Sequence, residues 1–267
     1  MDLGLSGKRA LVTGSSRGTG AAIARALARE GATVIVHGNT EGDQQKISAE
    51  IASGPGLSYS VTGDITTDAG AAEVVRSTTA VVGGVDVLVN NFGQATMGTW
   101  DDPSSEGFIR SYEVNTLSAV RMIHGFLAGM RERGHGRVIQ ITTIGTTRPG
   151  SRMPEYYAAK AALATLTVSL SKELAGTGIT VNTVSPGLIR TGEMEAYLRH
   201  LASKHGWGDD WAEIEARGVH KLTGVRLGRM ARPDEVADLV AFLSSERAAY
   251  LTGGNYRVDG GATDSVH

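Results

Sequence analysis

Short apolar runs alternate with stretches of helical periodicity along most of this chain. Between the apolar runs, hydrophobic side chains recur at helical spacing in residues 71–82, in residues 111–130 and again from Tyr156 to Leu174. Strands that alternate with helices at this interval predict an α/β fold with a Rossmann-like, doubly wound parallel sheet of about seven strands. The runs expected to form those strands are residues 9–13, 33–37, 57–62, 85–89, 137–142, 178–184 and 254–258.

One segment interrupts the alternation. Residues 192–221 have the pattern of two short helices around Gly206-Trp207-Gly208. This insertion is expected to act either as a lid over a pocket or as a surface or subunit contact. No repeat, linker or composition shift divides residues 1–267, so we expect a single domain.

Composition excludes several classes of function. The chain is 41% hydrophobic and 20% charged with a formal net charge of −2, and it has no basic run of the kind that binds nucleic acid or membranes. Because it shows neither a signal peptide nor a long apolar span, a cytoplasmic location is expected. Zero cysteines rule out thiolate catalysis and cysteine-based zinc sites, and the seven scattered histidines form no H-E-x-x-H pair, so no metal centre is expected.

A glycine-rich loop follows the first predicted strand and precedes a helical pattern. Its sequence is G-S-S-R-G-T-G, residues 14–20. Glycines let the backbone approach a pyrophosphate, and the N-terminus of the following helix offers unpaired N–H groups. The spacing is G-x-x-x-G-x-G instead of G-x-G-x-x-G. The alternative interpretation is that these residues form a flexible turn that binds no ligand.

The end of the second predicted strand bears on the choice of nucleotide. The sequence H-G-N-T, residues 37–40, stands where an acidic residue would bind the ribose hydroxyls of NAD. With Arg17 in the glycine loop, this leaves room and positive potential for a 2′-phosphate, so NADP(H) is expected in preference to NAD(H). The nearby acidic residues Glu41 and Asp43 oppose this preference. The alternative interpretation of Arg17 is that its side chain only faces water.

The chemistry is expected between residues 142 and 160. Tyr156 and Lys160 are four residues apart, so in a helix they share one face. A nearby fixed positive charge favours phenolate and would lower the pKa of a phenol from about 10 towards a working range. Taken alone, the pair reads more simply as a surface tyrosine and lysine at ordinary spacing.

Seven elements taken together carry a resemblance. They are T-G-S-S-R-G-T-G at residues 13–20, Asp64, N-N-F-G at residues 90–93, Asn115, Tyr156-x-x-x-Lys160, Pro186-Gly187 with Thr191, and G-G-N-Y-R-V-D-G-G at residues 253–261. Because these motifs occur in this order, the chain closely resembles the short-chain dehydrogenase/reductase family over nearly its whole length. Residues 227–236 and the C-terminal strand are most similar to the 3-oxoacyl-carrier-protein reductase branch, and the sheet order implied is 3-2-1-4-5-6-7.

The resemblance implies a role for each motif residue. Tyr156 would exchange a proton with the substrate oxygen, Lys160 would lower the tyrosine pKa and bind the nicotinamide ribose, and Asn115 would hold a water of a proton relay. Thr143 would be the second hydroxyl partner of the substrate oxygen. The residues implied in dinucleotide binding are Gly14, Ser16, Arg17, Gly18, Thr19, Gly20, His37, Asn39, Asp64, Ile65, Asn91, Phe92, Gly93, Tyr156, Lys160, Pro186, Gly187, Ile189 and Thr191.

The chain departs from the family pattern at two positions. Thr143 replaces the usual serine; it keeps the hydroxyl but adds a methyl group and a stiffer side chain. Thr142 is a possible substitute, although strand alternation would point it the other way. Phe92 replaces the usual alanine, and it either contacts the cofactor or fills a gap in the core.

The resulting hypothesis is an NADP-dependent reductase that acts on a small-molecule ketone or secondary alcohol. The resemblance also implies a homotetramer or homodimer, with the Tyr156 helix and the preceding helix in the main interface. Two alternatives stay open. One is a nucleotide-binding sensor or scaffold with little or no turnover, and the other is a different Rossmann-like enzyme such as a methyltransferase.

Overall fold

Seven parallel strands form a single sheet in the computed structural model, which describes residues 2–54, 56–101 and 104–264. The strand order is β3-β2-β1-β4-β5-β6-β7, so the predicted fold class and strand order are confirmed. In sheet order the strands are β3 (Ser58–Thr62), β2 (Thr33–Gly38), β1 (Arg9–Val12), β4 (Val87–Asn90), β5 (Gly136–Ile141), β6 (Ile179–Pro186) and β7 (Asn255–Val258).

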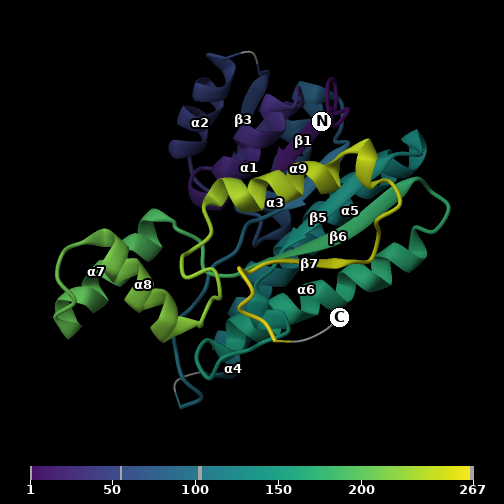
Figure 1. Cartoon of the computed structure of the whole chain (residues 1–267). Coiled ribbons are helices and arrows are strands. Elements are labelled where there is room, and N and C mark those ends of the chain that lie inside the picture. The colour runs from purple at the N-terminus through teal and green to yellow at the C-terminus, as the bar shows by residue number, and fades with distance from the viewer. Residues whose placement is uncertain (1, 55, 102–103, 265–267) are drawn as a thin grey trace.

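Helices cover both faces of the sheet because its strands are apolar on both sides (Figure 1). On one face, Ala10 and Val12 of β1 pack against α1 (Gly18–Arg29) and α9 (Pro233–Ser244). On the other face, Leu11 packs with residues of α3 (Asp68–Val82) and α5 (Ser118–Arg133). The remaining elements around the sheet are α2 (Asp43–Ala52), α4 (Ser105–Tyr112), the π-helical turn η1 (Glu113–Leu117), α6 (Pro154–Glu173) and the short turns η2 (Ile144–Thr146) and η3 (Glu246–Ala248).

The helix expected at residues 111–130 is part of a longer helical run. It starts six residues earlier, at Ser105, because the Ser104 hydroxyl accepts a hydrogen bond from the Gly107 N–H and caps the end. The π-helical turn at residues 113–117 then separates α4 from α5 and contains Asn115. Turns of this kind often occur at functional sites.

The insertion forms α7 (Gly192–His205) and α8 (Trp211–Leu222), as the sequence pattern predicts. Figure 1 shows this pair to one side of the sheet, away from the layers formed by α1 and α9. Its own apolar core holds it together and joins it to Ile144 of η2. Whether the pair acts as a lid stays a prediction. The buried residues of this small core are Ile144, Leu198, Ala202, Ile214, Val219, Val225, Met230 and Ala262.

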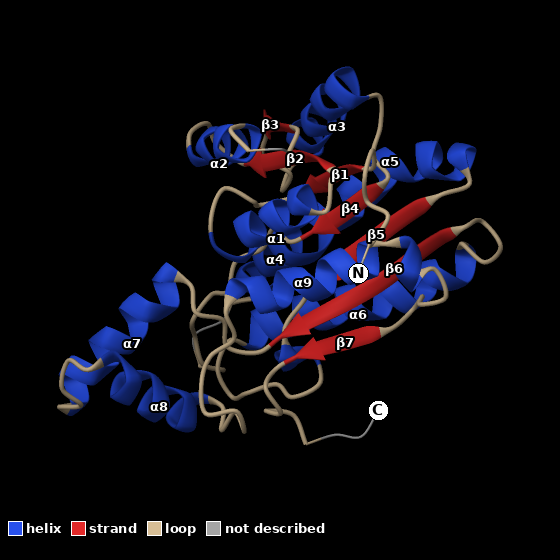
Figure 2. Cartoon of the chain, turned by 45° about the horizontal axis from the view of Figure 1, so that its top comes forward, coloured by secondary structure: helices blue, strands red, loops and turns tan. Residues whose placement is uncertain are grey.

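All seven strands have their carboxyl ends at one edge of the sheet, and the arrowheads of β6 and β7 in Figure 2 point towards the side where α7 and α8 lie. The order in which strands are added to the sheet reverses between β1 and β4. From β1 to β3 the chain adds strands towards one edge, and from β4 to β7 it adds them towards the other. Ligands of open parallel sheets bind at such a switch point. None of the helices in the described part of the chain is long and apolar enough to cross a bilayer.

Candidate active site

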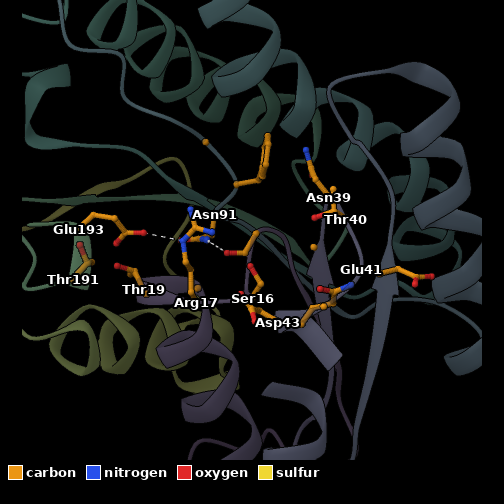
Figure 3. A pocket seen from close by; sticks show the side chains of 18 residues that line it. Ser16, Arg17, Thr19, Asn39, Thr40, Glu41, Asp43, Asn91, Thr191 and Glu193 are labelled. Carbon is orange, nitrogen blue, oxygen red and sulfur yellow. Dashed lines mark hydrogen bonds and ion pairs between the residues drawn. The ribbon is translucent and has the colours of Figure 1, made fainter. Parts of the chain in front are cut away.

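Two adjoining cavities lie at the carboxyl ends of the strands. The larger, of about 490 Å³, is bordered by the loops that follow β1, β2 and β4, together with Thr191 and Glu193 (Figure 3). The smaller, of about 180 Å³, contains Tyr156 and Lys160. Thr19, Asn91 and Gly93 line both cavities, which therefore form one elongated groove.

The glycine loop has the backbone that a pyrophosphate requires. Helix α1 begins at Gly18; the Arg17 side chain does not cap it, and its first turn has no acidic residue, so its positive end faces the larger cavity. Gly14 has a φ of 60°, in the left-handed region. A Cβ on Gly20 would lie 2.4 Å from the Gly14 carbonyl oxygen. The groove and this cradle therefore fit a dinucleotide.

Asn91 fastens the turn after β4 to the glycine loop. Its side-chain amide donates to the carbonyl oxygens of Thr13 and Gly14, both at 3.0 Å. The Thr13 hydroxyl in turn accepts from the backbone N–H groups of Asn91 and Phe92. These four bonds set the width of the groove where its two cavities meet.

The two helical residues expected to carry the chemistry share one face at the start of α6. Both Tyr156 and Lys160 line the smaller cavity, and Lys160 is only 3% exposed. The Lys160 ammonium donates to the Ile141 carbonyl oxygen at 2.9 Å, which fixes it at the end of β5. Burial lowers the pKa of Lys160 to about 8. The reading of this pair as a surface tyrosine and lysine is therefore excluded.

The pKa of Tyr156 differs from the expected direction. Burial, with a smaller contribution from Tyr157, raises it to about 12 instead of lowering it. The reason is that the phenol loses water on burial, which disfavours its charged form. In the chain by itself, Tyr156 is thus held protonated.

Asn115 supports this arrangement from the π-helical turn. Its amide donates to Gln94 O and to both the carbonyl and hydroxyl oxygens of Ser111, while its oxygen accepts from Gln94 N–H at 2.9 Å. These bonds hold the chain after β4, where a Cβ on Gly93 would lie 2.7 Å from the Asn115 amide oxygen and 2.9 Å from the Lys160 nitrogen. The water relay through Asn115 stays a prediction.

Thr142 and Thr143 both line the smaller cavity, but the Thr142 hydroxyl is hydrogen-bonded to β6. The Thr142 hydroxyl is buried against β6, 2.7 Å from the Ser185 hydroxyl. The Thr143 oxygen accepts from the Gly145 N–H at 3.2 Å and lines the smaller cavity with Tyr156. Because Thr143 only accepts in that bond, its own hydroxyl hydrogen stays available to a ligand oxygen.

Three residues expected to touch a nucleotide lie away from the cavity walls. The side chains of His37 and Ile65 are buried, at 0% and 1% exposure, so they do not line the larger cavity, and their part in nucleotide binding stays a prediction. Period-two alternation turns His37 beneath the glycine loop, and Ile65 packs into the core against α3. Asp64 is exposed and accepts from the Asn39 amide at 3.0 Å, so its contact with adenine stays a prediction.

The other residues expected around the dinucleotide line the groove, and Phe92 does so while also packing on the core beside α3 and α5. Phe92 therefore packs on the core, and its contact with the cofactor stays a prediction. Those in the larger cavity are Gly14, Ser16, Arg17, Gly18, Thr19, Gly20, Asn39, Asn91, Phe92, Gly93 and Thr191; those in the smaller are Thr19, Asn91, Gly93, Tyr156, Lys160, Pro186, Gly187 and Ile189.

Glu193 is a wall residue that sequence reasoning missed. Its carboxylate accepts from the Arg17 Nε at 2.8 Å across the larger cavity, as the dashed line in Figure 3 shows. The two residues are 176 positions apart, so only the fold brings them together. The available signal was its place two residues after Thr191, whose hydroxyl caps α7. Within the described part of the chain, no cluster of His, Cys, Asp and Glu could hold a metal ion.

Comparison with known proteins agrees with this geometry. The family model described as enoyl-(acyl carrier protein) reductase matches residues 14–263. An uncharacterized oxidoreductase of Bacillus subtilis, YvaG, is 35% identical over 100% of both chains. The 3-oxoacyl-(acyl-carrier-protein) reductase of Vibrio cholerae is 36% identical over 97% of this chain and 98% of its own.

Solved structures show the same likeness. L-sorbose reductase from Gluconobacter frateurii, complexed with NADPH and L-sorbose, has a TM-score of 0.93 at 33% identity and covers 100% of both chains. A 3-oxoacyl (acyl-carrier-protein) reductase from Agrobacterium tumefaciens with NADP bound has a TM-score of 0.86 at 33% identity, over 97% of this chain and 96% of its own.

Proposed function

This chain belongs to the short-chain dehydrogenase/reductase family and is an NAD(P)-dependent oxidoreductase, and on that premise we propose that it reduces a ketone to a secondary alcohol with NADPH. The observation that carries the proposal is the convergence of Thr143, Tyr156 and Lys160 on one cavity, which opens into the groove at the glycine loop. Two hydroxyl hydrogens and one ammonium there suit a carbonyl oxygen that gains negative charge.

A bound nicotinamide dinucleotide would supply the hydride. The chain's own residues supply the proton and the position. Tyr156 donates its phenol hydrogen to the carbonyl oxygen, and Thr143 donates a second hydrogen bond to the same oxygen. The Lys160 ammonium then stabilises the phenolate that Tyr156 becomes. Because burial raises the pKa of Tyr156, loss of its proton calls for a positive charge close by, and Lys160 is the proposed source of that charge.

Selection of NADPH rests on Arg17. Its side chain lines the larger cavity, where Asn39 and Thr40 follow β2 directly and the acidic Glu41 and Asp43 come next. In the chain alone Arg17 is paired with Glu193, and both side chains are well exposed, at 74% and 64%. An exposed pair of this kind is weak and gives way to a stronger anion, so a 2′-phosphate can take over the guanidinium.

We also propose that copies of the chain associate through α4 and α6. An apolar groove of about 430 Å³ on this face is lined by Phe108, Ile109, Leu117 and Ala158, and Ile109 is 65% exposed. Exposed apolar surface of this kind is typical of subunit interfaces. A second copy of this chain is the proposed occupant. A cytoplasmic location stays a prediction.

Tyr156→Phe is expected to remove nearly all turnover while the Kd for NADPH stays within about twofold, because the change deletes one hydroxyl and keeps the ring. Turnover of a ketone panel and calorimetry with NADPH measure the two quantities. Tyr157→Phe is the matched control and should keep most activity, since the Tyr157 ring packs on Gly145. Loss of turnover in the control alone would move the proton donor to Tyr157.

Thr143→Ala is expected to lower kcat by about 10²-fold, the usual effect of losing one donor to a developing oxyanion. Thr143→Ser keeps the hydroxyl and should retain a rate within about threefold of the parent. Steady-state kinetics of the three proteins on the same ketone give the comparison. If alanine turned over like the parent, the hydroxyl would have no part in the reaction.

Arg17→Ala is expected to raise the Kd for NADPH by about tenfold and leave that for NADH nearly unchanged, because it removes one charge-assisted contact to the 2′-phosphate. Glu193→Gln should have the opposite effect, since it frees the guanidinium. Calorimetry with both nucleotides at one fixed salt concentration measures the ratio. Equal weakening of both nucleotides would assign Arg17 to the shared pyrophosphate instead.

Ile109→Asp is expected to reduce the assembly mass measured by light scattering after size exclusion, because a carboxylate in the apolar groove opposes its burial. Val168→Asp, on the exposed side of α6 at 43% exposure, tests how far the interface extends along that helix. A parent protein that runs as a monomer at micromolar concentration would contradict the proposed association.

A further inference from the structure

His37 is a fully buried titratable side chain beneath the glycine loop, and the reaction described above does not use it. It is the next-to-last residue of β2, with 0% exposure. Its ring lies between the glycine loop and the end of β3, since it contacts Gly14 on one side and Gly63 on the other. A polar ring in this position needs partners for both nitrogens.

Three hydrogen bonds join His37 to the glycine loop. The ring Nδ1 accepts from the Gly14 backbone N–H at 3.0 Å. The His37 carbonyl oxygen accepts from the Ser15 N–H at 2.9 Å, and the His37 N–H donates to the Ser15 hydroxyl at 3.0 Å. The two backbone contacts could be made by any residue with an N–H at position 37. The bond to Gly14 requires a side-chain acceptor at this distance from the backbone.

The partners fix the protonation state of the ring. Gly14 offers an N–H, so Nδ1 must be an acceptor; Gly63 offers a carbonyl oxygen at 2.9 Å, so Nε2 must carry the hydrogen. Only the neutral imidazole with its hydrogen on Nε2 satisfies both. A second proton on Nδ1 would face the Gly14 N–H, and two donors repel.

Gly14 cannot easily move away from the ring. Its φ of 60° and the Phe92 backbone, whose Cα would lie 3.0 Å from a Gly14 Cβ, confine it. Phe92 also packs edge-on against the His37 ring, with centroids 6.4 Å apart. The imidazole of this β2 residue therefore contacts the three loops that follow β1, β3 and β4.

We propose that His37 is a positioning residue that holds the glycine loop in its nucleotide-binding form, and that only the neutral imidazole does so. The inference rests on the proposed use of a nicotinamide dinucleotide. It assigns to the side chain a role through Gly14 and not through contact with the nucleotide. Weakening of the Gly14 bond would change dinucleotide affinity before it changed the hydride or proton steps.

The charges around the ring support the neutral form. Burial lowers the pKa of His37, against opposing contributions from the Gly63 carbonyl and the Asp64 carboxylate. Among the described residues, Asp64 is the charged group whose field reaches the ring from the turn after β3. The loop's own Arg17 is paired with Glu193, and Asp43 at the start of α2 is paired with Lys46.

The sign of the pH effect follows from this shift. An unfolded histidine has a pKa of about 6.5, and the folded value is lower. The stabilisation is therefore complete above about pH 6.5 and is lost as the pH falls towards the folded pKa. Dinucleotide affinity should fall at the lower end of this range, near the folded pKa, because His37 of the folded protein becomes protonated there.

Two substitutions separate the two ring nitrogens. In His37→Asn the amide oxygen lies about where Nδ1 was and can accept from Gly14, but the bond to Gly63 is lost. In His37→Gln the amide reaches Gly63, and the Gly14 N–H is left without its acceptor. We expect the glutamine variant to raise the Kd for NADPH by about tenfold or more, and the asparagine variant by about threefold or less.

Calorimetry at pH 7.5 measures these affinities, and thermal unfolding checks that both variants are folded. Hydrogen exchange at the Gly14 and Ser15 amides, without nucleotide, should be faster in the glutamine variant alone. A glutamine variant that binds like the parent, or an asparagine variant that binds as weakly as glutamine, would overturn the assignment. A parent protein that binds no nicotinamide dinucleotide would instead reject the proposed function.

The pH dependence gives a second test that needs no stable glutamine variant. The Kd for NADPH is measured from pH 7.5 to 5 in the parent and in His37→Asn, while NMR of the ring nitrogens follows His37 in the parent. Any titration of the ligand's own phosphate is common to both proteins. We expect an extra loss of affinity in the parent that tracks His37 protonation. Parallel profiles for the two proteins would contradict a requirement for the neutral ring.

Discussion

The close approach of the glycine loop to the turn after β4, at the carboxyl edge of the sheet, is the constraint on which the site depends. A Cβ at Gly20 would meet the Gly14 carbonyl at 2.4 Å, and one at Gly93 would lie within 3 Å of both Asn115 and Lys160. The bonds from Asn91 to Thr13 and Gly14 fix the same turns to each other. With these turns in contact, the glycine loop and Tyr156 lie along one groove instead of in separate pockets.

Burial then gives the groove its chemistry. Removing Lys160 from water lowers its pKa to about 8, while the same loss of solvent raises the pKa of Tyr156 to about 12. The phenol of Tyr156 therefore stays protonated, and the pKa of Lys160 lies close to neutral pH. The protonation of both side chains then responds more strongly to a ligand that brings its own charge. The Ile141 carbonyl holds the lysine of this pair through a hydrogen bond, and Asn115 holds the neighbouring chain through its bonds to Gln94, without adding a charge of their own.

The sequence was sufficient to predict what depends on local pattern and on motif spacing. Short apolar runs and helical spacing located the strands and the α7–α8 insertion, and the four-residue spacing placed Tyr156 and Lys160 on one face. What could not be predicted depends on long-range packing. The pairing of Arg17 with Glu193 joins residues 176 positions apart, and the direction of the Tyr156 pKa depends on how much water the fold removes. His37 was expected among the nucleotide-binding residues because it stands at the end of the second strand, but the pleat of β2 turns its ring under the glycine loop.

The central claim is that this groove brings a nicotinamide cofactor and a ketone together for hydride transfer with Tyr156 as the proton donor. The most direct measurement uses NADPH carrying deuterium at the transferring position of nicotinamide C4, incubated with a panel of ketones. The products are examined by mass spectrometry and NMR. Deuterium on the carbinol carbon of at least one product alcohol, absent with Tyr156→Phe, is the predicted result. Tight binding of NADPH with no deuterium in any product would contradict the account and favour a nucleotide sensor on the same fold.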